Sequence, residues 1–146
     1  MTDDQISIQL IQGPIDVPSA SILPLIGCGG ECVFIGRTRP EEHNDQGSLI
    51  ALEYECYEEM AKKTLIELAT ESIHRFSIGY IRLTHSIGRV EINNASIVIA
   101  ASSMHRADAF RSCRFMIDLL KQRAPIWKQE IWSHGTTWSK GVPLKP

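Results

Sequence analysis

The stretch from Ser102 to Glu130 constrains the fold most, because it joins a long helix to a strand across a proline. Apolar residues three and four apart predict a helix that begins near His105 and ends before Pro125. Proline offers no N–H for a helical hydrogen bond and disfavours helical backbone in the residue before it. Residues 127–132 then alternate as in a strand. We therefore expect a helix packed by one face, followed directly by a strand.

The predicted helix has one apolar face with a lysine at its border. At about 100° of rotation per residue, Phe110, Cys113, Ile117 and Leu120 share that face, and Lys121 lies beside it. A lysine at the edge of a buried stripe either extends its ammonium into solvent or lines a pocket. Both interpretations of Lys121 stay open at this stage.

Positive charge is concentrated in the same region. Residues 105–128 contain six Lys or Arg and two Asp, a local charge of +4, whereas the whole chain carries −2 and the remainder −6. Arginine binds phosphate through a fork of N–H donors, and a helix start adds backbone donors. A lysine crowded by other cations and partly desolvated has a lowered pKa. These cations form either an anion site or an ordinary solvated surface.

The remaining pattern interleaves strands and helices. Alternating segments predict strands near residues 6–10, 31–36, 49–56, 80–88 and 95–102, and helical spacing marks residues 57–76. Short turns join several of the strands, and residues 40–47 form a polar loop. We therefore predict an α+β fold, a single-domain sandwich over residues 1–146 in which helices pack on a mainly antiparallel sheet. Glycine and proline in residues 133–146 indicate a largely irregular tail.

Composition narrows the possible functions. The mildly acidic balance argues against nucleic acid as a partner. No apolar run is long enough to span a membrane and the N-terminus lacks a signal-peptide core, so we expect no membrane partner and a cytoplasmic location. The scattered histidines show no metal-ligand spacing, so we predict no metal. Phosphate-loop, dinucleotide-binding and serine-hydrolase motifs are missing, and we predict no cofactor.

Five strings and a C-terminal tryptophan occur together in a specific order. The strings are F-x-G-x-x-R (Phe34 to Arg39), LEYECYEEMA (Leu52 to Ala61), HSIGRV (His85 to Val90), SSMHRADAF (Ser102 to Phe110) and LKQRAPIWKQE (Leu120 to Glu130). Trp138 follows Gly135. In this combination the chain resembles the large, catalytic subunit of molybdopterin synthase, from about residue 30 to 138.

The resemblance implies a sulfurtransferase. Its donor would be the C-terminal thiocarboxylate of a small ubiquitin-like sulfur-carrier subunit, and its acceptor cyclic pyranopterin monophosphate, which becomes the dithiolene of molybdopterin. It also implies a homodimer within a heterotetramer. The family's catalytic lysines fall on Lys121 and Lys128. Its substrate contacts fall on Arg37, Thr38, Arg39, His105, Arg106, Lys121, Lys128, Gln129 and Glu130.

One alternative stays open, a non-catalytic pterin- or anion-binding relative that keeps the pocket. The presence of both lysines favours the enzyme. His85 shares one side of a predicted strand with apolar residues, and we interpret it as a structural histidine rather than a catalyst. The separate proton-transfer roles of Lys121 and Lys128, and the residues at a dimer interface, are not readable from the chain.

Overall fold

The computed structural model describes residues 3–139 and contains three α-helices and eight strands in that range. A short 3-10 helix, Asp3–Gln5, precedes the first strand. The elements that follow are β1 (Ile6–Gln12), α1 (Val17–Ala20), β2 (Gly30–Arg37), β3 (Glu42–His43), β4 (Gly47–Cys56), α2 (Glu58–Phe76), β5 (Ile78–Glu91), β6 (Ala95–Ser103), α3 (Arg106–Arg123), β7 (Ile126–Trp132) and β8 (Gly135–Trp138).

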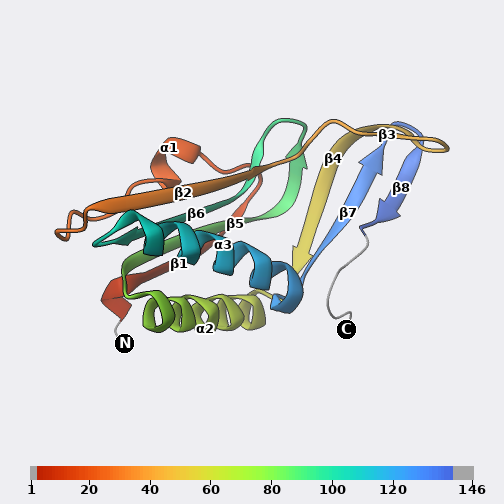
Figure 1. The fold of residues 1–146 in the computed structure, drawn as a ribbon. Coiled ribbons are helices and arrows are strands. Elements are labelled where there is room, and N and C mark those ends of the chain that lie inside the picture. Colours follow the sequence, from red (N-terminus) through yellow and green to blue (C-terminus); the bar gives the residue numbers. More distant parts are fainter. Residues whose placement is uncertain (1–2, 140–146) are drawn as a thin grey trace.

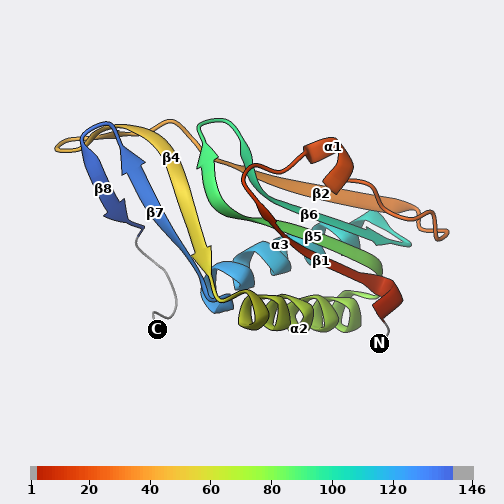
Figure 2. The same cartoon turned by 180° about the vertical axis from the view of Figure 1, so that it is seen from behind.

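The strands follow the order β2-β6-β5-β4-β7-β8, with β1 beside β5 and β3 beside β4. All neighbours are antiparallel except β1 and β5, which run parallel. Helices α2 and α3 lie along one face of the β1-β5-β6-β2 part, and α1 lies on its other face (Figures 1 and 2). The predicted α+β fold with a mainly antiparallel sheet is confirmed.

The long strand β5 divides the sheet into two parts. Its first part pairs with β6 up to His85, and its last residues, from Gly88 on, pair with β4. Gly88 has φ +81°, and a Cβ there would collide with the side chain of Gln12. Only glycine suits both the left-handed backbone and the close approach. Beyond this point β4, β7 and β8 stand apart from β2 and β6 (Figure 1).

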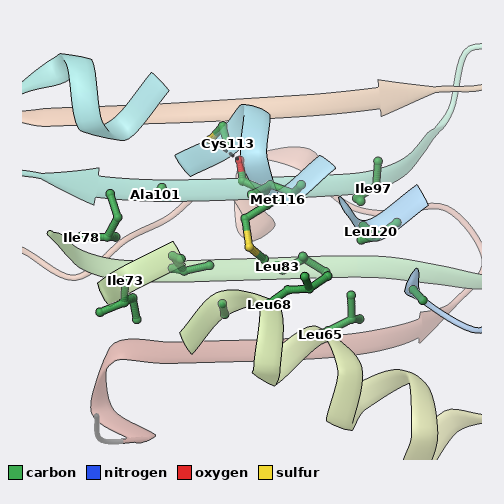
Figure 3. Close-up of a cluster of buried hydrophobic side chains, with 14 residues drawn as sticks. Leu65, Leu68, Ile73, Ile78, Leu83, Ile97, Ala101, Cys113, Met116 and Leu120 are labelled. Carbon is green, nitrogen blue, oxygen red and sulfur yellow. Dashed lines mark hydrogen bonds between the residues drawn. The ribbon is translucent and has the colours of Figure 1, made fainter. Parts of the chain in front are cut away.

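The main core lies between the helices and the sheet. Leu65 and Leu68 of α2 and Met116 of α3 meet Leu83 of the sheet (Figure 3). Ile99 belongs to the same cluster, and all five side chains are almost fully buried. The hydroxyls of Ser72 and Ser112, 2.7 Å apart, join the two helices inside this layer. Helix α3 therefore packs against both the sheet and α2.

The structure confirms most of the prediction for α3 and corrects one part. The helix ends at Arg123, and its last turn is capped by a hydrogen bond from the Ala124 N–H to the Leu120 carbonyl, immediately before Pro125. Cys113 and Leu120 are buried as predicted, but Phe110 is 60% exposed and Met116 is fully buried. The buried face is therefore rotated toward Met116, because α2 covers that side of the helix.

Two stretches predicted to be irregular each contain a short strand. In the tail, residues 135–138 form β8, which pairs with β7 and places Gly135 opposite Trp132. Its threonines and tryptophan favour extended backbone, and the edge of β7 offers it a partner. Within the predicted loop, β3 pairs with the start of β4. The tail residues 140–146 lie outside the described residues.

Candidate functional site

A pocket of about 400 Å³ opens where the two parts of the sheet diverge, beside the C-terminal end of α3. Its apolar wall consists of Phe34, Leu52, Ile97, Ile117, Leu120 and Ile126. Its polar side chains include Arg37, Tyr54, His85, Ser96, Lys121 and Lys128. Among residues 3–139, no Asp or Glu lines this pocket. Such a cavity suits a ligand that combines a flat apolar body with negative charge.

The helix–proline–strand connection brings the two lysines to the same pocket. Lys121 lies in the last turn of α3, and Lys128 lies on β7 opposite Tyr54 of β4. Side chains of directly opposed residues in a sheet project from the same face, so Lys128 and Tyr54 are neighbours. Both lysines line the pocket, as the resemblance implied for a pair of residues that act together.

Lys128 is half-buried, and its pKa is lowered from the usual value for a lysine. Burial is the main cause, because it disfavours the charged ammonium, and the charge of Lys121 adds to it. Glu130 and Glu41 oppose the change, and Arg39 reinforces it. A lysine in this setting keeps more neutral amine near neutral pH and can exchange a proton with a substrate.

Tyr54 and His85 form a polar part of the pocket wall. Their rings meet edge to face with centroids 5.2 Å apart. His85 is 5% exposed, its Nδ1 lies 2.8 Å from the Ser86 carbonyl, and its pKa is lowered to about 4, chiefly by burial. Burial also raises the pKa of Tyr54, and Ser96 beside it partly opposes this effect. The wall is therefore uncharged at neutral pH.

Sequence reasoning did not identify this wall. Tyr54 and His85 occur within two of the strings that carry the resemblance, but their alternation indicated only strand faces. One feature in the sequence could have indicated it: Tyr54 and His85 are both aromatic side chains with a polar atom on the inward face of a predicted strand. The pairing of β5 with β4 places them together, and that pairing is not readable from either strand alone.

The predicted contacts on residues 37–39 separate into three environments. Arg37 lines the pocket, and its guanidinium donates to the Asn93 carbonyl at 2.9 Å. Thr38 is buried, and its hydroxyl donates to the Val90 carbonyl at 3.3 Å. Arg39 is largely exposed and forms an ion pair with Glu41 at 2.9 Å. Of the three side chains, the structure brings only that of Arg37 into the pocket wall.

On β7, the alternation of side chains separates Gln129 from its neighbours. Glu130 shares the face of Lys128, and one of its carboxylate oxygens accepts a hydrogen bond from the Thr137 hydroxyl at 2.6 Å. Gln129 projects from the opposite face, between Glu53 and Trp138 on the adjacent strands. Neither residue lines the pocket within the single chain. Glu130 acts on the site through its charge near Lys128.

His105 and Arg106 lie at the start of α3, far from the lysines. Both are exposed, and neither lines the pocket. The helix rises about 1.5 Å per residue, so Arg106 and Lys121 are separated by on the order of 20 Å along the axis. The start of α3 packs closely against β2, because a Cβ added to Gly30 would lie 2.8 Å from backbone atoms of Arg106. Within one chain, the predicted cations therefore form two groups.

Within residues 3–139, no cluster of three or more His, Cys, Asp or Glu side chains is arranged to hold a metal ion. None of the helices described is both long and apolar enough to cross a membrane.

Comparison with known proteins places the chain in a family. The model of the family described as MoaE protein matches residues 2–123. The chain belongs to the MoaE family. The molybdopterin synthase catalytic subunit of Pyrococcus abyssi is 33% identical over 144 residues, which cover 94% of this chain and 96% of that protein. A crystal structure of molybdopterin synthase from Staphylococcus aureus has a TM-score of 0.79 and 32% identity, covering 89% of this chain and 94% of its own.

Relatives in the MoaE family differ in length. The molybdopterin synthase catalytic subunit of Drosophila erecta is 38% identical over 138 residues, covering 91% of this chain. The chain spans only 37% of that protein's length. The domain described above is thus the shared part, and in the archaeal relative it is nearly the whole protein.

Proposed function

We propose that this MoaE-family chain is the catalytic subunit of a molybdopterin synthase, a sulfurtransferase of molybdenum cofactor biosynthesis. The observation that carries the proposal is the meeting of Lys121 and Lys128 in one pocket with the pKa of Lys128 lowered. The similarity to proteins named molybdopterin synthase catalytic subunit supports the same activity. A cytoplasmic location stays a prediction.

The chemistry of the pocket suits both proposed reactants. The acceptor, cyclic pyranopterin monophosphate, has a flat ring system and a phosphate, and the pocket combines apolar walls with Arg37 and two lysines. The donor is a thiocarboxylate, also an anion, at the end of a thin tail. The thiocarboxylate sulfur bonds to a carbon of the acceptor and displaces an oxygen substituent there; water then adds to the carbonyl and the carbonyl C–S bond breaks, so the carrier is released as a carboxylate and the sulfur stays on the acceptor. The ammonium of one lysine stabilises the negative charge that develops at the carbonyl, and the other lysine exchanges protons with the acceptor.

The partner in this proposal is a small ubiquitin-like sulfur-carrier subunit. Relatives are named catalytic subunits, which supports the existence of a separate subunit. A C-terminal tail loses conformational freedom when it binds, so the pocket must supply anchoring contacts. Lys121 and Lys128 offer charge to its terminal group, and the apolar wall that includes Ile117 and Leu120 offers buried area.

The proposed assembly contains two copies of this chain. A single phosphate cannot contact both Lys121 and Arg106 of one chain, because the helix between them is on the order of 20 Å long. The resemblance nevertheless assigns both ends of α3 to the same substrate. A homodimer resolves this difference if the His105–Arg106 pair of one copy lies beside the pocket of the other. Each copy then binds one sulfur carrier, which makes a heterotetramer.

A single-turnover assay tests the proposal. The purified chain is mixed with thiocarboxylated sulfur carrier and cyclic pyranopterin monophosphate, and dithiolene formation is followed. Transfer that requires both reactants supports the proposal. Tight binding of the pterin with no transfer would instead identify a non-catalytic relative. Trimming the carrier by its last two residues should abolish transfer while leaving most of the docking affinity.

A further inference from the structure

The pocket holds many hydrogen-bond donors and few acceptors. Its charged side chains are Arg37, Lys121 and Lys128, and within residues 3–139 no Asp or Glu lines it. Cationic groups can only donate, which suits a phosphate. The pyrimidinone edge of a pterin, however, carries N–H donors, and a donor that is buried without an acceptor costs free energy. A side-chain acceptor for these donors can come only from the neutral polar residues of the pocket, which in the described range are Tyr54, His85, Ser96 and Ser139.

His85 is the member of this group that presents only an acceptor. Its Nδ1 lies 2.8 Å from the Ser86 carbonyl oxygen. Because a carbonyl only accepts, Nδ1 carries the proton, and Nε2 of the neutral ring is left with a lone pair. Burial lowers the pKa of His85 to about 4, so the ring keeps this acceptor at neutral pH. The other three side chains carry hydroxyls, which both donate and accept.

The lone pair of Nε2 is open to the pocket. The Nδ1 bond is the only hydrogen bond of this side chain within residues 3–139, so none joins it to a cation of the pocket. Although His85 is only 5% exposed, Nε2 is not among the unpartnered side-chain atoms that the protein encloses, a group that includes the adjacent Ser86 hydroxyl. An atom of a pocket-lining ring that has no partner and is not enclosed faces the pocket.

The imidazole of His85 is held from two sides. The Ser86 carbonyl engages Nδ1, and the ring of Tyr54 on β4 meets the imidazole edge to face with centroids 5.2 Å apart. Burial of a polar ring is unfavourable unless its nitrogens find partners, and Nε2 finds none in the described chain. Because the ring is already positioned, a ligand that supplies the missing donor loses little affinity to ordering this side chain.

We propose that His85 is a substrate-binding residue whose Nε2 accepts a hydrogen bond from an N–H on the pterin ring of the substrate. This inference rests on the proposed function, which supplies the pterin. The phosphate of the same substrate is left to the cations of the pocket. A ring that presents a lone pair in place of this N–H is disfavoured, because two acceptors then face each other. His85 therefore contributes to the choice of heterocycle rather than to the binding of phosphate.

Calorimetry with cyclic pyranopterin monophosphate and, separately, with inorganic phosphate tests this assignment. His85→Phe keeps a ring against Tyr54 but has no lone pair at the position of Nε2. We expect pterin affinity to fall about tenfold, the cost of leaving one buried donor unpaired, and phosphate affinity to stay within about twofold. His85→Gln can place an amide oxygen near that position and should recover most of the loss. As a control, His74→Phe changes an exposed residue of α2 outside the pocket and should leave both affinities unchanged.

Unchanged pterin affinity in His85→Phe, or an equal loss of pterin and phosphate affinity, would overturn the proposal. Nitrogen NMR of the wild-type imidazole gives an independent answer if that variant does not fold. The Nε2 resonance should move toward that of a hydrogen-bonded nitrogen when the pterin is added, and not when inorganic phosphate is added. No movement at saturation, or a proton on Nε2 of the free protein, would also overturn it.

These measurements separate the inference from the proposed function, because neither calorimetry nor NMR needs turnover or the sulfur carrier. A wild-type chain that binds the pterin through His85 but transfers no sulfur would count against the proposed function alone. A chain that transfers sulfur but shows the same pterin affinity in wild type and His85→Phe would count against this inference alone.

Discussion

The two ends of α3 carry cations that the resemblance assigns to one substrate, but the fold gives them opposite environments. At the C-terminal end, Lys121 joins Lys128 in a pocket between the helix and the diverging sheet. At the N-terminal end, His105 and Arg106 are exposed, and neither lines that pocket. Basic side chains therefore line a pocket at one end of the helix and face open solvent at the other.

This difference shows that burial, more than charge, prepares a lysine for chemistry. Lys128 has a lowered pKa chiefly because it is half-buried, and nearby cations contribute second. The exposed pair at the other end offers fork-like donors and the start of a helix, which suit binding of an anion. In the proposed function, one end of α3 exchanges protons and the other holds phosphate.

The largest expected effect is at the enclosed end. Lys121→Ala should lower the single-turnover rate by about 10² to 10⁴, the usual contribution of an acid–base group, without unfolding the chain. The matched control is Arg114→Ala, on the same helix, where an exposed arginine pairs with Asp118 at 3.5 Å. If both variants lost a comparable part of the single-turnover rate, the activity would be sensitive to the loss of any cation on α3. The difference between the two ends of the helix would then not explain the effect of Lys121→Ala.

A smaller effect concerns stability against pH in the same region. The pKa of His85 is about 4 in the folded chain and about 6.5 when unfolded. Between these values the unfolded chain binds the extra proton, so stability falls as pH drops from about 6.5 toward 4. By pH 4.5 the loss of stability assigned to His85 is on the order of 2 to 3 kcal/mol.

Denaturant titrations of wild type and His85→Gln at pH 7 and pH 4.5 measure this loss. Other titrating groups are shared by the two proteins, so they cancel in the comparison. Between the two pH values, the wild type should lose on the order of 2 to 3 kcal/mol more of its free energy of unfolding than the variant. Parallel losses would show that His85 is already able to protonate in the folded state.

The smallest effect is expected at the exposed end. Arg106→Ala should weaken cyclic pyranopterin monophosphate binding about tenfold, or about 1.4 kcal/mol, close to the lower end of what one hydrogen bond to a charged group contributes. Binding of the sulfur carrier should change less. Calorimetry with each ligand separately gives both values, and light scattering at each protein concentration reports the oligomer. A monomer that binds pterin with unchanged affinity would remove this end of α3 from the site.

Much of the fold was readable from local pattern. The helix over residues 106–123 and its stop before Pro125 follow from periodicity and from the missing N–H of proline. The mainly antiparallel sheet follows from alternating segments joined by short turns. The strand over residues 135–138 was missed, because it is short and its formation depends on pairing with the edge of β7 as well as on its own residues.

By itself, the sequence determined the element types, the cluster of positive charge and the resemblance that singled out Lys121 and Lys128. Only the tertiary structure decided which of the nine predicted site residues share a pocket. It buried Thr38, turned Gln129 to the far face of β7 and separated Arg106 from Lys121 by the length of a helix. It also added Tyr54 and His85 to the pocket. The reason is physical: periodicity reports the face of each element, whereas desolvation and proximity depend on how elements distant in the chain pack together.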